Sequence, residues 1–337
     1  MRISGLVANS AVFLALIATA SAQAVQVDEK LPAYEPVQGV SGTIKSIGSD
    51  TMNNLMALWG DGFRRFYPAA QTEVEGKGSS TAPPALIAGT ANFGPMSRPM
   101  KASEIDEFEK KFGYKPTALS TSIDMLAVFV HKDNPLEGLT LPQVDAIFSK
   151  NRKGGAKDNV RTWGELGLTG EWARQPMSLY GRNSASGTYG FFKDVALFGG
   201  DYKDEVKEQP GSSAVVQGVA SDKAGIGYSG IGFKTADVRA VPIQNDEGDL
   251  VEATPENAYS GAYPLARPLL LYINREPNKD LDPLRREFIR YIFSKEGQQD
   301  VIKAGFNPVT FAVAKRSLAA IGVELKEAKA VEAGSPR

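Results

Sequence analysis

The 337-residue sequence contains no cysteine and only one histidine, His131. Without cysteine the chain has no disulfide, no thiolate nucleophile, no cysteine-ligated metal and no lipid-modified cysteine. A single histidine, at the end of an apolar strand-like run, disfavours histidine-based metal sites and histidine catalysis. A chain of this composition depends on its hydrophobic core for stability, and its length favours two domains over one.

The sequence also lacks an excess of charge of one sign, since 38 Lys and Arg residues balance 39 Asp and Glu residues. This balance indicates neither a nucleic-acid surface nor a polybasic membrane patch. The sequence contains no Walker motif of nucleotide-binding proteins and no G-x-S-x-G elbow of serine hydrolases. Residues 225–230 match G-x-G-x-x-G, but no helical pattern follows them, as a dinucleotide-binding site requires. We therefore expect no cofactor and no nucleic-acid partner, and any attraction for an anion must be local to a site.

The longest apolar run lies near the N-terminus, from Leu6 to Ala20, and is short and alanine-rich for a membrane span. It follows Met1-Arg2 and precedes small residues that fit cleavage after Ala22 or Ala24. A basic start, a short apolar stretch and an A-x-A site predict a cleavable secretory signal peptide at 1–24, with an uncleaved anchor as the alternative.

Beyond a polar, proline-containing arm, strand-like and helix-like segments alternate, which favours α/β sheets covered on both faces. The expected strands are 42–48, 71–75, 92–94, 125–131, 177–180, 224–228, 242–244 and 267–273. The expected helices are 53–67, one that starts near 83, 104–112, 140–148, 162–166, 191–198, 284–293 and 295–303.

The run 181–190, Gly-Arg-Asn-Ser-Ala-Ser-Gly-Thr-Tyr-Gly, lies where an expected strand turns into an expected helix. The first N–H groups of a helix have no intrahelical partner, and the helix dipole is positive there. Glycine permits close approach to the backbone, hydroxyls add donors, and Arg182 adds a charged planar fork that suits phosphate-like oxygens. This pattern indicates an oxyanion site.

Two similar clusters, 48–52 (Gly-Ser-Asp-Thr-Met) and 78–81 (Gly-Ser-Ser-Thr), also fall between a strand and a helix. Ligands of open α/β sheets bind at the carboxyl ends of strands, so three such ends could surround one tetrahedral oxyanion. Three independent helix N-caps are the alternative, although a cap requires only one such side chain. Arg98, in a proline-stiffened loop, is either a further ligand or a surface residue.

Five segments together resemble the phosphate-binding proteins of phosphate ABC importers, the PstS-like family. They are GSDTM (48–52), GKGSSTAPPALIAGTANFGPMSRPM (76–100), GRNSASGTYGFF (181–192), KAGIGYSGIGF (223–233) and YIFSKEGQQDVIKAGFNPV (291–309). The resemblance covers about Gly42 to Val309, and R-x-x-x-S-G-T is its most specific part. It implies a two-lobed, type II-like periplasmic binding protein with a hinge between two mixed-sheet lobes.

The resemblance also implies a function and a division of the chain. The protein would be a monomeric periplasmic receptor, not an enzyme, which captures inorganic phosphate between the lobes and delivers it to ABC transporter permease subunits. The residue patterns themselves give a signal peptide at 1–24, a flexible arm at 25–40 and a tail at 326–337. The resemblance assigns 41–123 and 240–325 to lobe one and 124–239 to lobe two, with the hinge near Asp124 and Ala240.

Carried over by motif, the resemblance assigns ligand roles to the three clusters and departs from the family at two positions. Ser97 stands where the family usually has an aspartate that accepts the phosphate proton, and Ser184 stands where an aspartate often follows the site arginine. Asp50, or else Asp124, is then the expected acceptor. The candidate ligand residues are Asp50, Thr51, Met52, Ser79, Ser80, Ser97, Arg98, Arg182, Ser186, Gly187 and Thr188.

Two other functions stay open on the sequence alone. The first is a receptor for another tetrahedral oxyanion such as sulfate, because sulfate carries no proton and needs no acceptor. The second is a periplasmic phosphatase that uses one of the site serines, for which the chain offers mainly carboxylates as the base or as metal ligands.

Overall fold

The computed structural model describes residues 25–328, so the expected signal peptide at 1–24 and the last part of the expected tail lie outside the described residues. The strands are β1 Gly42–Ile47, β2 Ala70–Glu75, β3 Gly94–Met96, β4 Thr117–His131, β5 Ser178–Arg182, β6 Lys207–Gln209, β7 Gly225–Gly230, β8 Val238–Val241, β9 Ile243–Gln244, β10 Leu250–Val251, β11 Ala266–Ile273 and β12 Asn307–Pro308. The α-helices are α1 Asn53–Arg64, α2 Ala82–Ala88, α3 Ala102–Phe112, α4 Leu141–Phe148, α5 Gly187–Val195, α6 Ser212–Ala220, α7 Pro255–Ser260, α8 Pro283–Ile292, α9 Lys295–Lys303 and α10 Phe311–Ala319.

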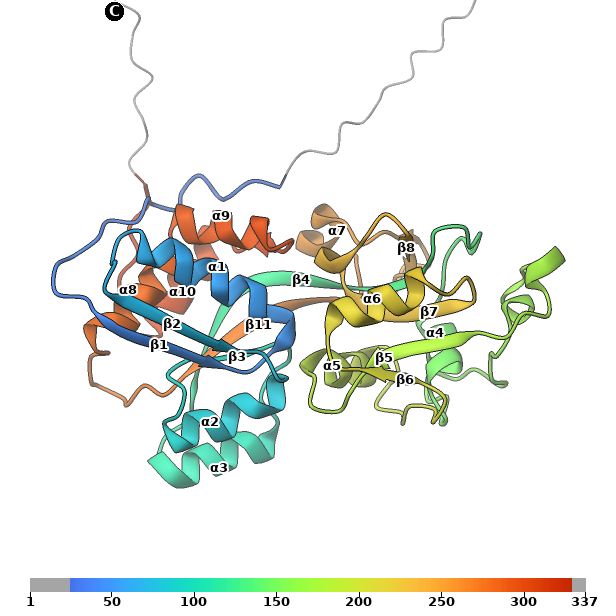
Figure 1. The fold of residues 1–337 in the computed structure, drawn as a ribbon, viewed down its shortest axis with the longest axis horizontal. Helices are drawn as coiled ribbons and strands as arrows, with labels where there is room; N and C mark the ends of the chain where they lie inside the picture. The colour runs from blue at the N-terminus through green and yellow to red at the C-terminus, as the bar shows by residue number, and fades with distance from the viewer. Residues whose placement is uncertain (1–24, 329–337) are drawn as a thin grey trace, which may run out of the picture.

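The elements form two lobes that lie side by side, and the long strand β4 runs from one lobe into the other (Figure 1). Lobe one contains β1–β3, α1–α3 and α8–α10, and lobe two contains α4–α7 and β5–β10. The first half of β4 pairs with β11 and the second half with β7 and β8, all antiparallel. The predicted mixed α/β, two-lobed fold is therefore confirmed.

Each lobe has its own strand arrangement around this shared strand. In lobe one, β1 and β2 are parallel, and β3 pairs with β11 beside β4. In lobe two, the strand order from β4 is β7, β5, β6, with β5 parallel to both of its neighbours. Parallel strands require crossover connections, and here α1 connects β1 to β2, α5 connects β5 to β6, and α6 connects β6 to β7. The crossovers bring several helix starts to the same ends of the sheets.

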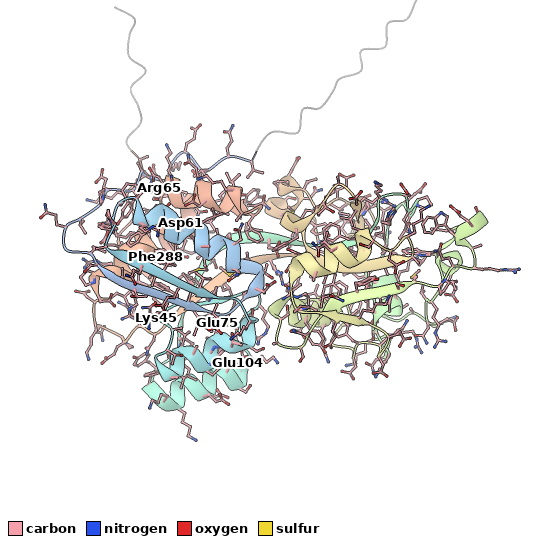
Figure 2. The ribbon with its side chains drawn as sticks, viewed as in Figure 1. Lys45, Asp61, Arg65, Glu75, Glu104 and Phe288 are labelled. Atoms are coloured by element: carbon pink, nitrogen blue, oxygen red, sulfur yellow. The ribbon has the colours of Figure 1, made fainter. Side chains whose placement is uncertain are left out.

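The core of lobe one is built on the apolar stripe of α1, whose buried Leu55, Trp59 and Phe63 recur every four residues. Phe63 packs edge-on against Phe288 of α8, with ring centroids 5.3 Å apart (Figure 2 labels Phe288). The indole N–H of Trp59 donates to the Gly297 carbonyl at the start of α9. These contacts fix α1, and hence its first turn at the lobe boundary.

The core of lobe two holds α5 against the sheet. Phe192 of α5 stacks on Tyr228 of β7, with ring centroids 3.9 Å apart and nearly parallel planes. The hydroxyl of Tyr228 accepts a hydrogen bond from the backbone N–H of Arg182, at the end of β5, at 3.2 Å. The aromatic pair therefore connects the helix start and the strand end that the sequence analysis singled out.

The two core clusters suggest a later lobe boundary than residue 240. Val241, Ile243, Tyr263 and Leu265 pack in the cluster of lobe two, although they fall in the expected lobe one segment 240–325. We therefore propose that lobe two extends to Leu265 and that the chain returns to lobe one along β11. The apolar run of β11 was recognised, but nothing local in 240–265 indicates which core it joins.

The segment 25–40, expected to be a flexible arm, contains no helix or strand but is packed onto lobe one. Leu31 is fully buried and Tyr34 nearly so. The Tyr34 hydroxyl shares a 2.8 Å hydrogen bond with the Tyr67 hydroxyl and donates to Glu287 at 3.0 Å. The anchoring side chains follow no helical or strand period, which is why the pattern of apolar residues did not reveal them.

Most of the expected elements are confirmed, with differences that have local causes. The strand expected at 125–131 begins at Thr117, because its first half alternates with Ser and Thr and resembles a loop in sequence. The helices α6, α7 and α10 were not expected; in α6 the cluster of valines favours a strand by propensity. No helix within residues 25–328 combines the length and the apolar character needed to cross a bilayer.

Candidate functional site

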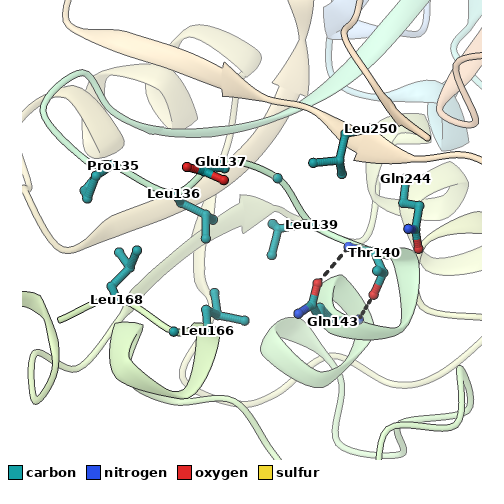
Figure 3. A pocket seen from close by; sticks show the side chains of 12 residues that line it. Pro135, Leu136, Glu137, Leu139, Thr140, Gln143, Leu166, Leu168, Gln244 and Leu250 are labelled. Carbon is teal, nitrogen blue, oxygen red and sulfur yellow. Dashed lines mark hydrogen bonds between the residues drawn. The ribbon is translucent and has the colours of Figure 1, made fainter. Parts of the chain in front are cut away.

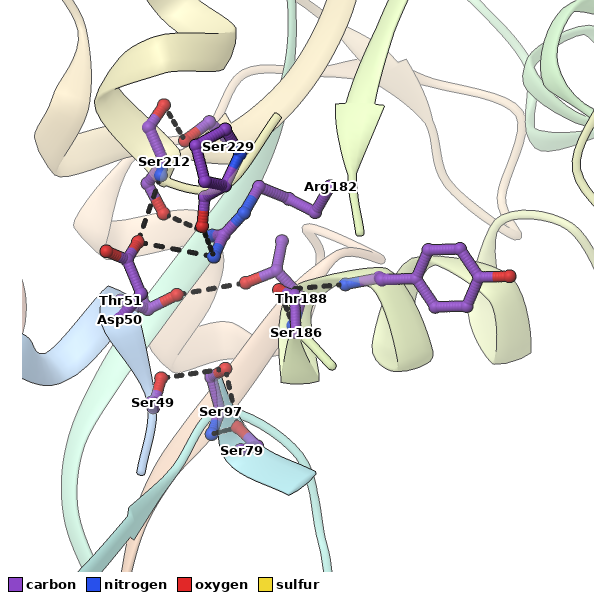
Figure 4. A network of polar contacts seen from close by, with 12 residues as sticks. Ser49, Asp50, Thr51, Ser79, Ser97, Arg182, Ser186, Thr188, Ser212 and Ser229 are labelled. Atoms are coloured by element: carbon purple, nitrogen blue, oxygen red, sulfur yellow. Dashed lines mark hydrogen bonds and ion pairs between the residues drawn. The ribbon is translucent and has the colours of Figure 1, made fainter. Parts of the chain in front are cut away.

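Three helix starts meet at the boundary between the lobes (Figure 4). A 3₁₀ turn, Asp50–Met52, leads into α1, and a second, Ser79–Thr81, leads into α2. Both come from lobe one, whereas α5 comes from lobe two. Hydrogen bonds between residues of the three clusters, described below, show that the structure brings them together. Free N–H groups and the positive ends of helix dipoles therefore face one region.

Three buried serines join the loops of lobe one. The Ser49 hydroxyl donates to the Ser97 hydroxyl at 3.1 Å, and the Ser79 and Ser97 hydroxyls are 3.3 Å apart. The backbone N–H of Ser97 donates to the Ser79 hydroxyl at 3.0 Å. We call these residues the serine triad. Because each serine follows a different strand, the triad fixes the loops after β1, β2 and β3 relative to one another.

Two glycines let lobe two approach the triad. A Cβ atom on Gly187 would lie 2.2 Å from the Ser79 hydroxyl and 2.6 Å from that of Ser97. Gly78 has φ +113°, and a Cβ there would lie 2.5 Å from the Ala185 carbonyl of lobe two. Both positions therefore require glycine while the lobes are in contact. The Ser80 N–H donates to the same carbonyl of Ala185, at 3.1 Å, so the lobes are closed on each other here.

The start of α5 carries two hydroxyls with different tasks. Ser186 is the N-cap, and its oxygen accepts hydrogen bonds from the N–H groups of Thr188 and Tyr189. Its hydroxyl hydrogen is still able to donate. The Thr188 hydroxyl lies 3.0 Å from the Thr51 hydroxyl of lobe one. The cap role considered as an alternative therefore holds for Ser186, while Thr188 and Thr51 face each other across the boundary.

Arg182 lies at the end of β5 with its side chain 1% exposed. Its guanidinium donates to the Ser212 hydroxyl at 2.7 Å and to the Pro210 carbonyl at 3.2 Å. Its Nε–H is buried and has no hydrogen-bond partner within residues 25–328. Burial lowers the pKa of Arg182; the carboxylate of Asp50 opposes this shift, and the positive charge of Arg267 adds to it. A further negative group would therefore be stabilised near Arg182.

Asp50 reaches from lobe one to lobe two. Its carboxylate lies 3.3 Å from the Arg182 guanidinium and accepts the N–H of Ser212, the first residue of α6, at 3.0 Å. A carboxylate at a helix N-terminus is favoured by the dipole. Asp50 is 25% exposed, so it is not sealed in the protein as Arg182 is. Asp50 therefore lies in the cluster, and its partners here are the protein groups of Arg182 and Ser212.

A second ion pair lies beside the cluster. The Arg267 guanidinium binds Asp124 at 2.7 Å, and these side chains are 1% and 0% exposed. Arg267 also donates to the Ser97 carbonyl at 2.8 Å and to the Thr188 hydroxyl at 2.9 Å. The second oxygen of Asp124 is buried without a hydrogen-bond partner among the described residues. Asp124, the less favoured acceptor in the sequence analysis, is thus neutralised by a buried arginine.

Three of the predicted ligand side chains, those of Arg98, Ser80 and Met52, have other partners within lobe one. The Nη1 and Nη2 atoms of Arg98 donate to the Glu104 carboxylate, at 2.8 and 2.7 Å, and Nη2 also donates to the Ser80 hydroxyl. Met52 is fully buried in the core of lobe one, so only its backbone could contact a ligand. Ser184 is exposed. The contacts of Arg98 fit a role in holding the loop after β3.

Four residues of the cluster were absent from the predicted site. Ser49 lies inside the quoted GSDTM motif, so its place in the loop after β1 was a usable signal. Ser212, whose hydroxyl accepts from Arg182, lies in an ordinary polar segment. Ser229, whose hydroxyl donates to the Ser212 carbonyl, lies in the buried strand β7, inside the quoted KAGIGYSGIGF motif. Arg267 lies in an apolar strand run. Only the fold brings the last three to the site.

A separate cavity of lobe two has a different character (Figure 3). It has a volume of about 520 Å³ and lies beside the N-terminus of α4, where Thr140 and Gln143 form reciprocal hydrogen bonds. Leucines 136, 139, 166 and 168 line it together with Glu137. None of the described residues that line it is Lys or Arg, so it offers an anion no cationic partner.

The cluster at the lobe boundary therefore combines many donors with balanced protein charge. Its two arginines face two aspartates, and its hydroxyls and helix starts supply neutral donors from both lobes. Neutral donors and partly paired arginines suit a small multidentate oxyanion better than an apolar ligand. Among residues 25–328, no group of three His, Asp or Glu side chains is arranged to hold a metal ion.

Comparison with known proteins agrees with this architecture. A model of the PBP superfamily domain matches residues 33–296, and the chain therefore belongs to that superfamily of two-lobed binding proteins. The phosphate-binding protein PstS of Pseudomonas aeruginosa is 51% identical over 324 residues, which cover 96% of this chain and 100% of that protein. PstS of Staphylococcus haemolyticus is 30% identical over 265 residues, 77% of this chain and 79% of that protein. Within the superfamily, this chain belongs to the family of PstS phosphate-binding proteins.

Solved structures extend the comparison. A structure assigned to a phosphate ABC transporter substrate-binding protein of Clostridium perfringens, with phosphate bound, is 26% identical with a TM-score of 0.67 and covers 80% of this chain and 100% of that chain. An ABC-type phosphate transport receptor of Vibrio cholerae has a TM-score of 0.60 at 21% identity and covers 79% of this chain and 99% of that chain, which supports the fold.

Proposed function

We propose that this protein captures inorganic phosphate between its two lobes and delivers it to an ABC importer. Membership of the PstS family supports the proposal, as do relatives named as phosphate-binding proteins and a related substrate-binding protein with phosphate bound. The observation in the molecule that carries it is the convergence of three helix starts and Arg182 at the lobe boundary. Phosphate is small, tetrahedral and rich in acceptors, which is what such a set of donors requires.

The proposed ligand set follows from these contacts. Thr51 and Thr188 face each other across the boundary, and Ser79 and Ser97 line the approach of Gly187. Arg182 supplies the charge, with one buried N–H still unpaired among the described residues. The proposed ligand residues are Thr51, Ser79, Ser97, Arg182, Ser186, Gly187 and Thr188, with Asp50 as the acidic neighbour and Met52 through its backbone. We propose that Arg98 and Ser80 support the loop and do not bind phosphate directly.

The proposed location is outside the cytoplasm, in the periplasm, after removal of a signal peptide at 1–24. The support is the pattern of a basic start, a short apolar run and a small-residue cleavage site in the sequence. We further propose that the mature protein is a monomer that meets permease subunits with both lobes. A non-enzymatic role fits relatives that are named as binding proteins.

Isothermal titration of the dialysed mature protein with phosphate, sulfate and molybdate tests the function. We expect phosphate to bind and Arg182→Ala to weaken it by about 2–5 kcal/mol, roughly 30-fold or more, because a charge-assisted contact with a buried anion is lost. Arg239→Ala is a matched control: Arg239 is a partly buried arginine of lobe two that donates to the Asn134 carbonyl and makes no contact with the cluster.

The outcomes separate the candidate functions. A folded Arg182→Ala protein with wild-type phosphate affinity would place the site elsewhere. Sulfate binding as tight as phosphate binding would support a general oxyanion receptor, for which Ser97 in place of an aspartate is the favouring observation. Turnover of a chromogenic phosphate ester, with or without divalent metal, would support a phosphatase instead of a binding protein.

A further inference from the structure

Arg267 and Asp124 occupy the two strands that cross between the lobes. In the antiparallel pairing of β4 with β11, these residues lie directly opposite each other. Their side chains are almost completely buried, and Asp124 accepts both Nε and Nη2 of Arg267, at 3.1 and 2.7 Å. The ion pair is thus a fixed part of the connection between the lobes.

From this position, Arg267 contacts both lobes. Its Nη1 donates to the Ser97 carbonyl in lobe one at 2.8 Å. Its Nη2 donates to the Thr188 hydroxyl in lobe two at 2.9 Å, and the Phe191 ring of α5 lies 5.1 Å from the guanidinium carbon. Opening of the lobes would separate Arg267 from Thr188 and Phe191 or from Ser97, so all of these contacts coexist only when the lobes are closed.

The contacts also orient groups that face the proposed ligand. Because the Thr188 oxygen accepts from Arg267, the Thr188 hydrogen is free to be donated, either to Thr51 or to an anion. The backbone of Ser97 is held on both sides of its Cα atom, since its carbonyl accepts from Arg267 and its N–H donates to the Ser79 hydroxyl. Arg267 therefore fixes one donor of each lobe through its contacts with the Ser97 carbonyl and the Thr188 hydroxyl.

We propose that Arg267 is a positioning residue that couples closure of the lobes to the phosphate site, an inference that rests on the proposed function. Asp124 holds the guanidinium on the hinge strands, and the remaining donors of the fork join Ser97 of lobe one to Thr188 of lobe two. Only arginine has enough donors in a fixed plane to serve three directions, so the role depends on the fork as well as on the charge.

Arg267→Lys tests the fork, because lysine keeps the charge opposite Asp124 but replaces the planar set of donors by one ammonium group. We expect a folded protein with phosphate affinity reduced roughly tenfold or more, as for the loss of a hydrogen bond to a charged group. The loss should appear as faster dissociation in stopped-flow measurements, because the closed form is the state that is weakened. Arg239→Lys is the matched control, and its affinity should stay within about twofold of the wild type.

A second variant keeps the test decisive if Arg267→Lys does not fold. Phe191→Leu retains Arg267 and removes the aromatic face that lobe two places on it. We expect it to raise the dissociation rate of phosphate roughly two- to fivefold, the size of a cation–π contact, with little change in association. Unchanged dissociation in a folded Arg267→Lys would overturn the proposal, and so would equal losses in Arg267→Lys and Arg239→Lys. If Arg267→Lys does not fold, unchanged dissociation in Phe191→Leu overturns it.

The wild type separates this inference from the function on which it rests. Tight phosphate binding by the wild type, together with unaffected variants, removes the coupling role and leaves the proposed function intact. A wild type that binds neither phosphate nor sulfate removes both. Phosphate binding by the wild type with rapid release from Arg267→Lys, but not from Arg239→Lys, supports the role.

Discussion

At the scale of single residues, Asp50 has two tasks that can be separated by experiment. Its carboxylate joins the lobes through Arg182 and the Ser212 N–H, and it is the proposed acceptor for the proton of phosphate. The first task affects every anion that binds in the closed form. The second affects only anions that carry a proton, because sulfate has none to donate.

We therefore predict that Asp50→Asn narrows the difference in affinity between phosphate and sulfate. An unpaired phosphate O–H costs about 1–3 kcal/mol, so the ratio of the sulfate dissociation constant to the phosphate dissociation constant should fall roughly tenfold. Titration of the variant with both anions measures this ratio. The loss of contacts between the lobes weakens the binding of both anions equally and therefore does not change the ratio. Asp124→Asn is the comparison, since Asp124 was the other candidate. An unchanged ratio in Asp50→Asn would show that Asp50 is not the acceptor that distinguishes phosphate from sulfate. An unchanged ratio in both variants would show that neither carboxylate has this role on its own.

The same scale shows how far sequence reasoning reaches for the site. Ser79, Thr188 and Arg182 were selected because hydroxyls, glycines and arginine gather where strands turn into helices, a signal contained in a few consecutive residues. Arg267 carries no such signal, because its partners Asp124 and Thr188 are 143 and 79 residues away in the chain. The pairing of β4 with β11 brings Asp124 to Arg267, and the contact between the lobes brings Thr188; one sequence specifies neither.

At the scale of elements, the start of α3 is fixed by Glu104 (labelled in Figure 2). Its carboxylate accepts the N–H of Lys101 at 2.8 Å and both arms of the Arg98 guanidinium. Burial tends to raise the pKa of Glu104, but the hydrogen bonds from Arg98 and Lys101 outweigh it and lower the pKa below 4.5. The loop after β3, which carries Ser97, is thereby attached to α3.

We predict that Glu104→Gln lowers the free energy of unfolding at pH 7 by about 1–3 kcal/mol, since charge-assisted hydrogen bonds are lost. A carboxyl whose pKa is lower in the folded protein stabilises it above the unfolded pKa, and this contribution disappears as pH falls through the folded pKa. The difference between wild type and variant should therefore shrink as the pH is lowered below about 4.5. Urea unfolding from pH 7 to 3 measures it.

Glu107→Gln provides the control on the same helix, because Glu107 is exposed. It should change stability by less than about 0.5 kcal/mol at every pH. A Glu104→Gln protein that loses stability equally at pH 7 and pH 3 would show that the carboxylate charge is not responsible.

Elements were predicted well where one face is regularly apolar, as in α1 and α8, and poorly where composition conflicts with structure. The valines of α6 favour a strand locally, yet its start is stabilised by Asp50 from the other lobe. The first half of β4 has the Ser and Thr content of a loop but pairs with β11 along its length. In both cases, contacts distant in sequence override local preference.

At the scale of the whole molecule, the lobes are in contact in this structure, and ligand should favour that state. We predict that saturating phosphate reduces the radius of gyration in X-ray scattering and raises the melting temperature, because the ligand contacts both lobes only when they are closed. An identical scattering curve with and without phosphate, in a protein shown to bind it, would argue against closure around the ligand.

Gly187→Ala is the matched variant for this measurement. Its added methyl would meet the Ser79 and Ser97 hydroxyls in the closed form only, and alanine is otherwise favourable at the start of a helix. We expect the variant to fold normally and to bind phosphate at least roughly tenfold more weakly. Its radius of gyration should decrease less on addition of phosphate than that of the wild type.

The passage of the chain between the lobes limits how they can move. It crosses once along β4 and returns along β11, and these strands are hydrogen-bonded to each other with an irregularity in register between Leu269 and Leu270. A paired ribbon resists sliding and stretching but can bend and twist. Bending or twisting of the ribbon would change the angle between the outer faces of the lobes, so a partner that touches both faces would sense occupancy from that angle without touching the ligand.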